Sequence, residues 1–325
     1  MRILSGIQPS GVLHIGNYFG MMRPAIELQK EAETFYFIAD YHALTSVRDP
    51  EALCKNSRQV ALDFLACGLD PERAALFRQS DVPQVTELAW ILSTIAPTGL
   101  LERAHSYKDK LARGLAPTVG LFSYPVLMAA DILIYDSDAV PVGKDQKQHI
   151  EITRDLAMKI NETFESEPDR PIFKLPEPRI NPDTQVVPGL DGQKMSKSYG
   201  NNIDIFGDEK ETRKRVMSIV TDSTPVEAPK DATKSTILQL YSLFASKEEI
   251  ANMRDRFKKG GTGYGDFKKE LFEKLWEYFS PMRKRRDEIL RDKSYIDNVL
   301  AQGAKRANEI ADDVMTRVRA AVGLR

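Results

Sequence analysis

A glycine-rich turn near the start of the chain, residues 6–17 (the glycine turn), most constrains the fold. It follows the apolar pair Ile3-Leu4 and precedes a segment with apolar residues on one helical face, so it joins a strand to a helix. Gly11 and Gly16 let a ligand approach the backbone where a side chain would block it. The first N–H groups of the helix lack intrahelical partners and favour an anion such as phosphate. Taken alone, the turn is as compatible with a plain strand-to-helix connection that binds no ligand as with a phosphate-binding turn.

Strand and helix patterns alternate after this turn. Buried strands are predicted at residues 34–40, 75–80 and 139–142, and helices at residues 49–68, 86–96, 100–111, 119–135 and 144–164. Prolines crowd residues 166–189, which predicts loop or short extended structure there. The alternation predicts an α/β fold with a Rossmann-like, doubly wound parallel sheet. From residue 208 the pattern is nearly all helical, so an α-helical domain follows a boundary near residue 200.

Composition excludes several classes of protein. No apolar run approaches the roughly 20 residues that span a bilayer, and no signal-peptide core precedes the first strand, so we expect a cytoplasmic protein without a membrane partner. Lys plus Arg number 46 against 47 for Asp plus Glu, which gives no overall attraction to nucleic acid and no indication of DNA binding, although a local basic face remains open. Histidines and cysteines show no zinc-ligand spacing, so no protein-held metal is expected.

A second motif, Lys194-Met195-Ser196-Lys197-Ser198 (the lysine loop), follows two glycines. Two lysines three residues apart are by themselves most often a solvated surface. Together with His14-Ile15-Gly16-Asn17 in the glycine turn, however, the lysine loop resembles the paired HIGH and KMSKS motifs of the class I aminoacyl-tRNA synthetases. Asn17 departs from the family, which has histidine at that position.

Residues 124–133 and 140–151 resemble the substrate-binding segments of the family members that use tryptophan, and the resemblance covers nearly the whole chain. It implies that ATP activates L-tryptophan to tryptophanyl-AMP and that the acyl group then passes to tRNA(Trp). It also implies a catalytic domain at residues 1–200, with a helical dimerisation segment at about 85–165, and an anticodon-binding domain at 201–325. The protein is then expected to be a homodimer and to use Mg²⁺ together with ATP.

By this resemblance, lysines neutralise the charge that develops on the phosphates as pyrophosphate leaves. The catalytic lysines are Lys194, Lys197 and Lys110, with Lys108 as the competing choice for the third. Contacts with ATP are expected from Gln8, Pro9, Ser10, Gly16, Asn17, Gly143, Lys144, Asp145, Val186, Lys194, Met195, Ser196, Lys197 and Ser198. Lys144 replaces the family's commoner glutamate, so a backbone contact is retained there and a carboxylate role is not.

Asp131 is the predicted determinant of amino-acid choice. A carboxylate among apolar neighbours is costly if it is unpaired, and an indole N–H, which can only donate, suits an acceptor at the floor of a pocket. The alternative is that Asp131 only caps a helix or pairs with a neighbouring base. The resemblance completes the pocket for the tryptophan ring and α-amino group with Leu4, Gln8, His42, Tyr124, Met128 and Gln146.

Three other functions are compatible with parts of this pattern. A tyrosine-specific enzyme shares the fold and both motifs, but residues 124–131 argue against it. A synthetase-like nucleotide- or RNA-binding paralogue without charging activity would not need Lys110, Lys194 and Lys197. A nucleotidyltransferase of the same superfold would need neither the helical half nor the segment that contains Asp131.

Overall fold

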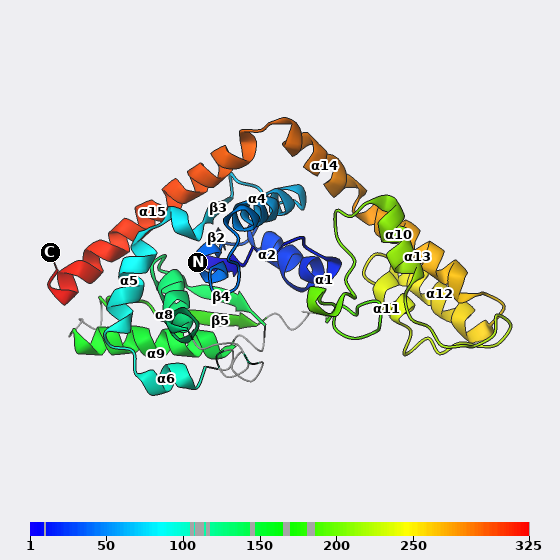
Figure 1. Ribbon diagram of the computed structural model, residues 1–325, viewed down its shortest axis with the longest axis horizontal. Coiled ribbons are helices and arrows are strands. Elements are labelled where there is room, and N and C mark those ends of the chain that lie inside the picture. The colour runs from blue at the N-terminus through cyan, green and yellow to red at the C-terminus, as the bar shows by residue number, and fades with distance from the viewer. Residues whose placement is uncertain are drawn as a thin grey trace.

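The computed structural model describes residues 1–9, 11–104, 107, 114, 118–143, 147–164, 170–180 (Ile180 by its backbone only) and 186–324. It contains a parallel sheet of five strands in the order β3-β2-β1-β4-β5, which confirms the predicted doubly wound α/β fold (Figure 1). The strands are β1 Arg2–Ile7, β2 Glu33–Ile38, β3 Ala74–Arg78, β4 Ala139–Val142 and β5 Glu177–Ile180. The strand order reverses between β1 and β4, and open α/β sheets bind ligands at such a point.

Helices connect the strands and form the second half of the chain. Those of the α/β half are α1 Ile15–Asn17, α2 Arg23–Leu28, α3 Asp40–Ala43, α4 Pro50–Ala66, α5 Gln84–Ser93, α6 Thr98–Glu102, α8 Val119–Leu133 and α9 Lys147–Thr163. Those that follow are α10 Glu209–Met217, α11 Thr236–Tyr241, α12 Lys247–Lys259, α13 Tyr264–Tyr278, α14 Ser280–Arg291 and α15 Tyr295–Val322. In the part of the chain that the structure describes, no helix is both long and apolar enough to cross a membrane.

The alternation of side chains along β2 divides the core between the two faces of the sheet. Phe35 and Phe37 pack with α5, α8 and α9, whereas Tyr36 and Ile38 pack with α2 and α4. Each face is covered, as a parallel sheet requires, because its strands are apolar on both sides. The helices therefore hold the carboxyl ends of β1, β2 and β4 in fixed positions.

The proline-rich stretch contains a strand that the sequence does not specify. Residues 166–189 are predicted as loop or short extended structure, and β5 lies within them as the edge strand beside β4. Pro178, opposite Val140, lacks an N–H, and an edge position tolerates proline because one side of the strand needs no ladder hydrogen bonds.

The last helix returns to the α/β half and covers the opposite edge of the sheet. Helix α15 runs along β3, with Gly303 placed where a Cβ would lie 2.0 Å from the carbonyl oxygen of Leu76 (Figure 1). Ala307, Ala311 and Val314 of α15 share the core of α5 and α8. The helix thus protects an edge strand from pairing with another chain.

We expect Gly303→Ala to destabilise the protein by about 2 kcal/mol, because the added methyl group overlaps strand backbone that cannot easily move. The midpoint of urea unfolding measures the change. Gly265→Ala in α13 is the matched control: among the described residues, no atom outside its own stretch of helix lies within 4 Å of the added Cβ, so helix propensity should leave stability equal or higher. Equal midpoints for the two variants would contradict the close packing of α15 on β3.

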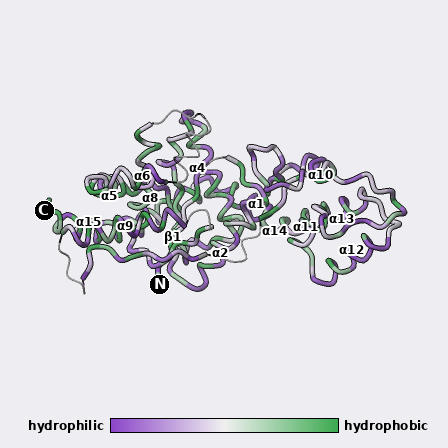
Figure 2. The backbone as a smooth tube through the Cα atoms, turned by 90° about the horizontal axis from the view of Figure 1, so that it is seen from below, coloured by the Kyte–Doolittle hydropathy of each residue, from purple (hydrophilic) through white to green (hydrophobic). Residues whose placement is uncertain are grey.

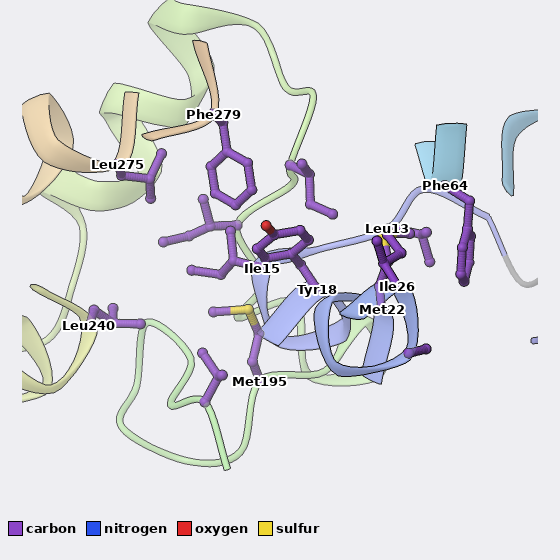
Figure 3. Packing of buried hydrophobic residues seen from close by; sticks show 14 of the residues in the cluster. Leu13, Ile15, Tyr18, Met22, Ile26, Phe64, Met195, Leu240, Leu275 and Phe279 are labelled. Atoms are coloured by element: carbon purple, nitrogen blue, oxygen red, sulfur yellow. The ribbon is translucent and has the colours of Figure 1, made fainter. Parts of the chain in front are cut away.

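The remaining helices form a lobe beside the α/β half, and the molecule is elongated (Figure 2). Residues that directly follow the glycine turn contact this lobe: the Tyr18 ring lies 5.1 Å from that of Phe279, and Phe19 lies 5.4 Å from Phe244. Figure 3 shows Tyr18 facing Phe279, with Met195 and Leu240 nearby in the same cluster. The core is therefore continuous between the two halves, and the predicted division of the chain at residue 200 stays a prediction.

Candidate active site

A cavity of about 410 Å³ opens at the carboxyl ends of the central strands, where the strand order reverses. Its volume is within the usual range for small-molecule sites. Its walls come from β1, β2, β4, α8, α9 and the residues that follow β2. The lining residues are Leu4, Gly6, Gln8, Phe37, Ala39, His42, Thr45, Tyr124, Met128, Asp131, Ile132, Val140 and His149.

Six of the seven residues predicted for the amino-acid pocket line this cavity, namely Leu4, Gln8, His42, Tyr124, Met128 and Asp131. The seventh, Gln146, lies outside the described residues. Gly6 shapes the floor, because a Cβ there would lie 2.4 Å from the Phe37 ring. The Phe37 ring therefore packs directly against β1, and polar groups of α8 and α9 border the cavity.

Asp131 has two polar partners at the bottom of the cavity. It is 1% exposed, and its carboxylate accepts Gln79 Nε2 at 2.7 and 2.9 Å and contacts His42 Nε2 at 2.8 Å. Burial raises the pKa of this carboxyl group, and the hydrogen bond with His42 opposes the rise. Two carboxylate oxygens have about four acceptor positions, so a donor in the cavity can still be accepted. Asp131 therefore both pairs with a neighbouring base and faces a ligand space.

Gln79 is an organising residue that the sequence did not reveal. Its side chain is fully buried, and its Oε1 accepts the backbone N–H of Tyr41 at 3.1 Å while its amide group holds Asp131. It thereby joins β3 to the short helix α3, which carries His42. The sequence shows only that Gln79 lies near the end of the predicted strand at residues 75–80. His149, whose ring lies 5.6 Å from that of Tyr124, is a second lining residue without an assigned role in the sequence.

The glycine turn is closed by a reciprocal pair of hydrogen bonds at the start of α1. The backbone N–H of Asn17 donates to His14 Nδ1 at 3.2 Å, and the backbone N–H of His14 donates to Asn17 Oδ1 at 3.1 Å. Burial, together with the positive charge of Lys197, lowers the pKa of His14 to about 4. His14 is therefore neutral at physiological pH, as an acceptor at Nδ1 requires. Asn17 fulfils the capping role at the last position of the motif.

The lysine loop lies directly against the glycine turn. The ammonium nitrogen of Lys197 lies 3.4 Å from the position that a Cβ would occupy at Gly11, and Met195 Cβ lies 3.2 Å from that position at Gly16. Residues just after the loop pair with the turn, since Ile15 N–H donates to the Ile203 carbonyl and Ile205 N–H to the Leu13 carbonyl. The two motifs, 180 residues apart in the chain, form one surface.

Asn201, another residue that sequence reasoning missed, organises the lysine loop. It is buried, accepts the Ser196 backbone N–H at 2.8 Å, and donates to Asp191 Oδ1 and to the Lys194 carbonyl. Gly189 makes room for it, because a Cβ there would lie 2.3 Å from the Asn201 side chain. These contacts fix the backbone of the lysine loop.

The residues predicted to contact ATP are distributed around this surface. Lys194 and Ser198 are exposed, Lys197 and Ser196 are half-buried, and Ser196 Oγ lies 2.8 Å from Ser198 Oγ. The Met195 side chain is buried in the core and anchors the loop. Gln8 and Pro9 lie in the first part of the glycine turn, and Gly143 follows β4. The exposed Val186 precedes Val187, whose carbonyl accepts the Met195 N–H. Ser10, Lys110, Lys144 and Asp145 lie outside the described residues, as does Lys108.

Burial lowers the pKa of Lys197, and the carboxylates of Asp204 and Asp63 oppose that shift. A half-buried ammonium group next to open glycine backbone is placed to meet a phosphate. Over the described part of the chain, no group of three or more His, Cys, Asp or Glu side chains is placed to hold a metal ion.

Comparison with known proteins gives three concordant results. The family described as tRNA synthetases class I (W and Y) matches residues 1–280. A tryptophan–tRNA ligase of Fusobacterium nucleatum is 53% identical over 99% of this chain and 98% of its own, and one of Rhodopirellula baltica is 54% identical over the full length of both. The crystal structure of tryptophanyl-tRNA synthetase from Campylobacter jejuni, complexed with ADP and tryptophan, superposes with a TM-score of 0.94 at 50% identity, covering 99% of this chain and 100% of that one.

Proposed function

The chain belongs to the class I tRNA synthetases for tryptophan and tyrosine, and we propose on that premise that it is a tryptophan–tRNA ligase. It activates L-tryptophan with ATP to tryptophanyl-AMP and transfers the acyl group to tRNA(Trp). Asp131 carries the choice of amino acid, because it is a buried acceptor at the floor of a cavity that adjoins the two paired motifs. This arrangement provides one place for an aromatic amino acid and another for a nucleotide.

Tryptophan enters the cavity with its indole ring between the apolar walls of β1 and α8. The indole N–H donates to the Asp131 carboxylate, which His42 and Gln79 hold in orientation. Phenylalanine lacks that donor and would leave a buried carboxylate without its ligand, which a site of this kind rejects strongly. Gln8, which lines the cavity and belongs to the glycine turn, contacts the α-amino group in this proposal.

The glycine turn and the lysine loop take the nucleotide. Asn17 Oδ1 accepts the His14 N–H, so its NH₂ group is the end that can donate to a phosphate or ribose oxygen. The tryptophan carboxylate attacks the α-phosphorus and pyrophosphate leaves. Lys194 and Lys197, with Lys110, stabilise the negative charge that develops on the leaving phosphates.

Mg²⁺ accompanies ATP in this proposal and neutralises phosphate charge. Magnesium commonly binds through substrate phosphates and water with few protein ligands, which fits a described site that offers donors to phosphate and no cluster of protein carboxylates.

The helical half is the proposed anticodon-binding domain, and residues 85–165 contain the proposed dimerisation segment. Exposed basic residues of α14 such as Lys284 and Arg285 can contact tRNA phosphates, which contribute affinity without sequence information. Because tRNA and ATP are both present in the cytoplasm, we place the proposed activity there.

Exchange of pyrophosphate into ATP tests the assignment. We expect exchange that depends on L-tryptophan and a much weaker reaction with L-tyrosine, followed by charging of tRNA(Trp). Exchange supported by tyrosine alone would identify the tyrosine-specific enzyme. Exchange without any charging of tRNA would identify a paralogue that has lost transfer.

For the proposed homodimer, Trp90 supplies a measurable prediction. Its side chain is 72% exposed on α5, within the proposed dimerisation segment, and large exposed aromatic residues are typical anchors of interfaces. We expect Trp90→Ala to weaken dimerisation about tenfold in sedimentation equilibrium. Val226→Ala, an exposed apolar residue in the helical lobe, is the control. A dimer equally stable in both variants would remove Trp90 from the interface.

A further inference from the structure

Residues 200–202 (the joint) connect the lysine loop to the segment that pairs with the glycine turn. Gly200 follows the short 3₁₀ helix Lys197–Tyr199 and has a φ of 65°, in the left-handed region that glycine adopts readily. Just beyond the joint, Ile203 and Ile205 form backbone hydrogen bonds with the glycine turn. The conformation of the joint therefore sets how the lysine loop faces that turn.

Packing does little to fix the joint at Gly200. Among the described residues, no atom outside its chain neighbours lies within 4 Å of a Cβ built there, and the residue is exposed. Glycine also has more conformational freedom than any other residue. Asn201 anchors the middle of the joint by its side chain, whereas the carbonyl groups of Gly200 and Asn202 need another donor.

Arg215, in the last turn of α10, supplies that donor. Its Nε donates to the Asn202 carbonyl at 2.5 Å, and its Nη2 donates to the Gly200 carbonyl at 2.7 Å. A guanidinium group is planar and presents its donors as a rigid fork, so it fixes the two carbonyl groups relative to each other. The bond to Gly200 is exposed and water could replace it, so the arginine contributes orientation more than stability.

Helix α10 belongs to the helical lobe, so Arg215 reaches the joint from the second half of the chain. The helix packs on α13, and its Val216 shares a core with Met195 of the lysine loop (Figure 1). Three residues before the joint, Lys197 Nζ lies 3.4 Å from the Cβ position at Gly11 of the glycine turn. Rotation at the joint would displace this ammonium group, and a misplacement of about 1 Å can slow a reaction about 100-fold.

We propose that Arg215 is a positioning residue for the lysine loop: its guanidinium group holds the joint so that Lys197 faces the glycine turn, and this placement therefore depends on the seating of α10. The proposal rests on the proposed function, in which Lys197 stabilises the leaving phosphates. Arg215 acts on the backbone of this chain, through both of its hydrogen bonds. Its loss should slow the chemical step and leave tryptophan binding intact, because neither the joint nor α10 lines the cavity that contains Asp131.

Arg215→Ala and Arg215→Lys test this role in the full-length protein, by tryptophan-dependent pyrophosphate exchange and by single-turnover formation of tryptophanyl-AMP. For Arg215→Ala we expect kcat to fall about tenfold while KM for tryptophan stays unchanged. For Arg215→Lys we expect a fall of about threefold, because an ammonium group keeps the charge but cannot hold both carbonyls as a planar fork does. The lysine variant also keeps the aliphatic stem, so it supplies the test if the alanine variant folds poorly.

Arg213→Ala is the matched control, since it removes the same charge from the same helix. Arg213 is exposed, and its guanidinium group lies over the Phe272 ring, 5.3 Å from the ring centre, rather than at the joint. Its kcat and KM for tryptophan should equal those of the wild type.

A Lys197→Ala background shows whether the effect of Arg215 passes through that lysine. There, Arg215→Ala should slow single-turnover adenylate formation by at most about twofold more, since two changes that remove one interaction are not additive. An equal loss in both backgrounds, a wild-type kcat in Arg215→Ala, or a rise in KM for tryptophan with kcat intact overturns the proposal. A wild-type protein that fails to exchange with tryptophan would instead overturn the proposed function.

Discussion

Replacing Lys197 by alanine is expected to slow adenylate formation by about 10²- to 10³-fold, the usual cost of removing one preorganised group that faces developing charge. The ammonium nitrogen lies against Gly11 in the glycine turn, where a phosphate would be cradled. Its interaction grows as charge accumulates on the leaving pyrophosphate, so kcat should fall much more than the affinity for tryptophan. Single-turnover formation of tryptophanyl-AMP measures the effect directly.

Two features make the interpretation of Lys197→Ala secure. Burial already lowers the pKa of this lysine, so removing the charge relieves a desolvation cost and should not unfold the protein. Lys30→Ala removes an exposed lysine that follows α2 and should leave the rate at its wild-type value. A Lys197→Ala variant that forms adenylate at the wild-type rate would exclude this lysine from the chemistry.

The residues that the sequence predicts for these roles share one property: they belong to short local patterns. Lys197 stands in a recognisable motif, and Asp131 is a charged residue in an otherwise apolar helical segment. The strands β1 to β4 were equally accessible, because buried parallel strands are continuous apolar runs. Each of these signals is contained in about ten residues and is independent of the rest of the fold.

The features that were missed depend on pairs distant in the chain. Gln79 meets Asp131 across 52 residues, and Asp63 meets Arg286 across 223. Nothing in the local sequence of Gln79 distinguishes it from a polar residue at the end of a strand. Strand β5 is specified by its pairing with β4, which overrides the proline content of its own sequence. Tertiary contacts decide such positions, and a single sequence does not display them.

The position of α15 in the fold is another feature that its own sequence does not specify. Its amphipathic pattern predicts a long helix, and the structure confirms that helix from Tyr295 to Val322. The pattern does not identify the surface that the apolar face covers. That surface is the edge strand β3, and the helical lobe lies between the two in the sequence. The lobe is therefore held at both ends, by the glycine turn through Tyr18 and by α15.

Replacing Asp131 by asparagine should lower kcat/KM for tryptophan about 100-fold, because a hydrogen bond to a charged acceptor is worth up to about 3 kcal/mol and an amide retains only part of it. The new NH₂ group must also face Gln79 Nε2 or His42 Nε2, so one of these donors loses its acceptor. The affinity for ATP, whose proposed site is the glycine turn and the lysine loop, should change little. Pyrophosphate exchange at varied tryptophan, tyrosine, phenylalanine and ATP concentrations separates these effects.

Asp136→Asn is the matched control, since Asp136 lies just beyond the same helix, α8, and pairs with Arg317 at 2.7 Å away from the cavity. Its positive φ of 48° is one that asparagine tolerates, so the backbone should be undisturbed. Discrimination against tyrosine and phenylalanine should narrow in Asp131→Asn and stay unchanged in Asp136→Asn. Should Asp131→Asn retain full discrimination, the carboxylate would be a structural partner of His42 and Gln79 alone, and amino-acid choice would have to come from the shape of the apolar walls.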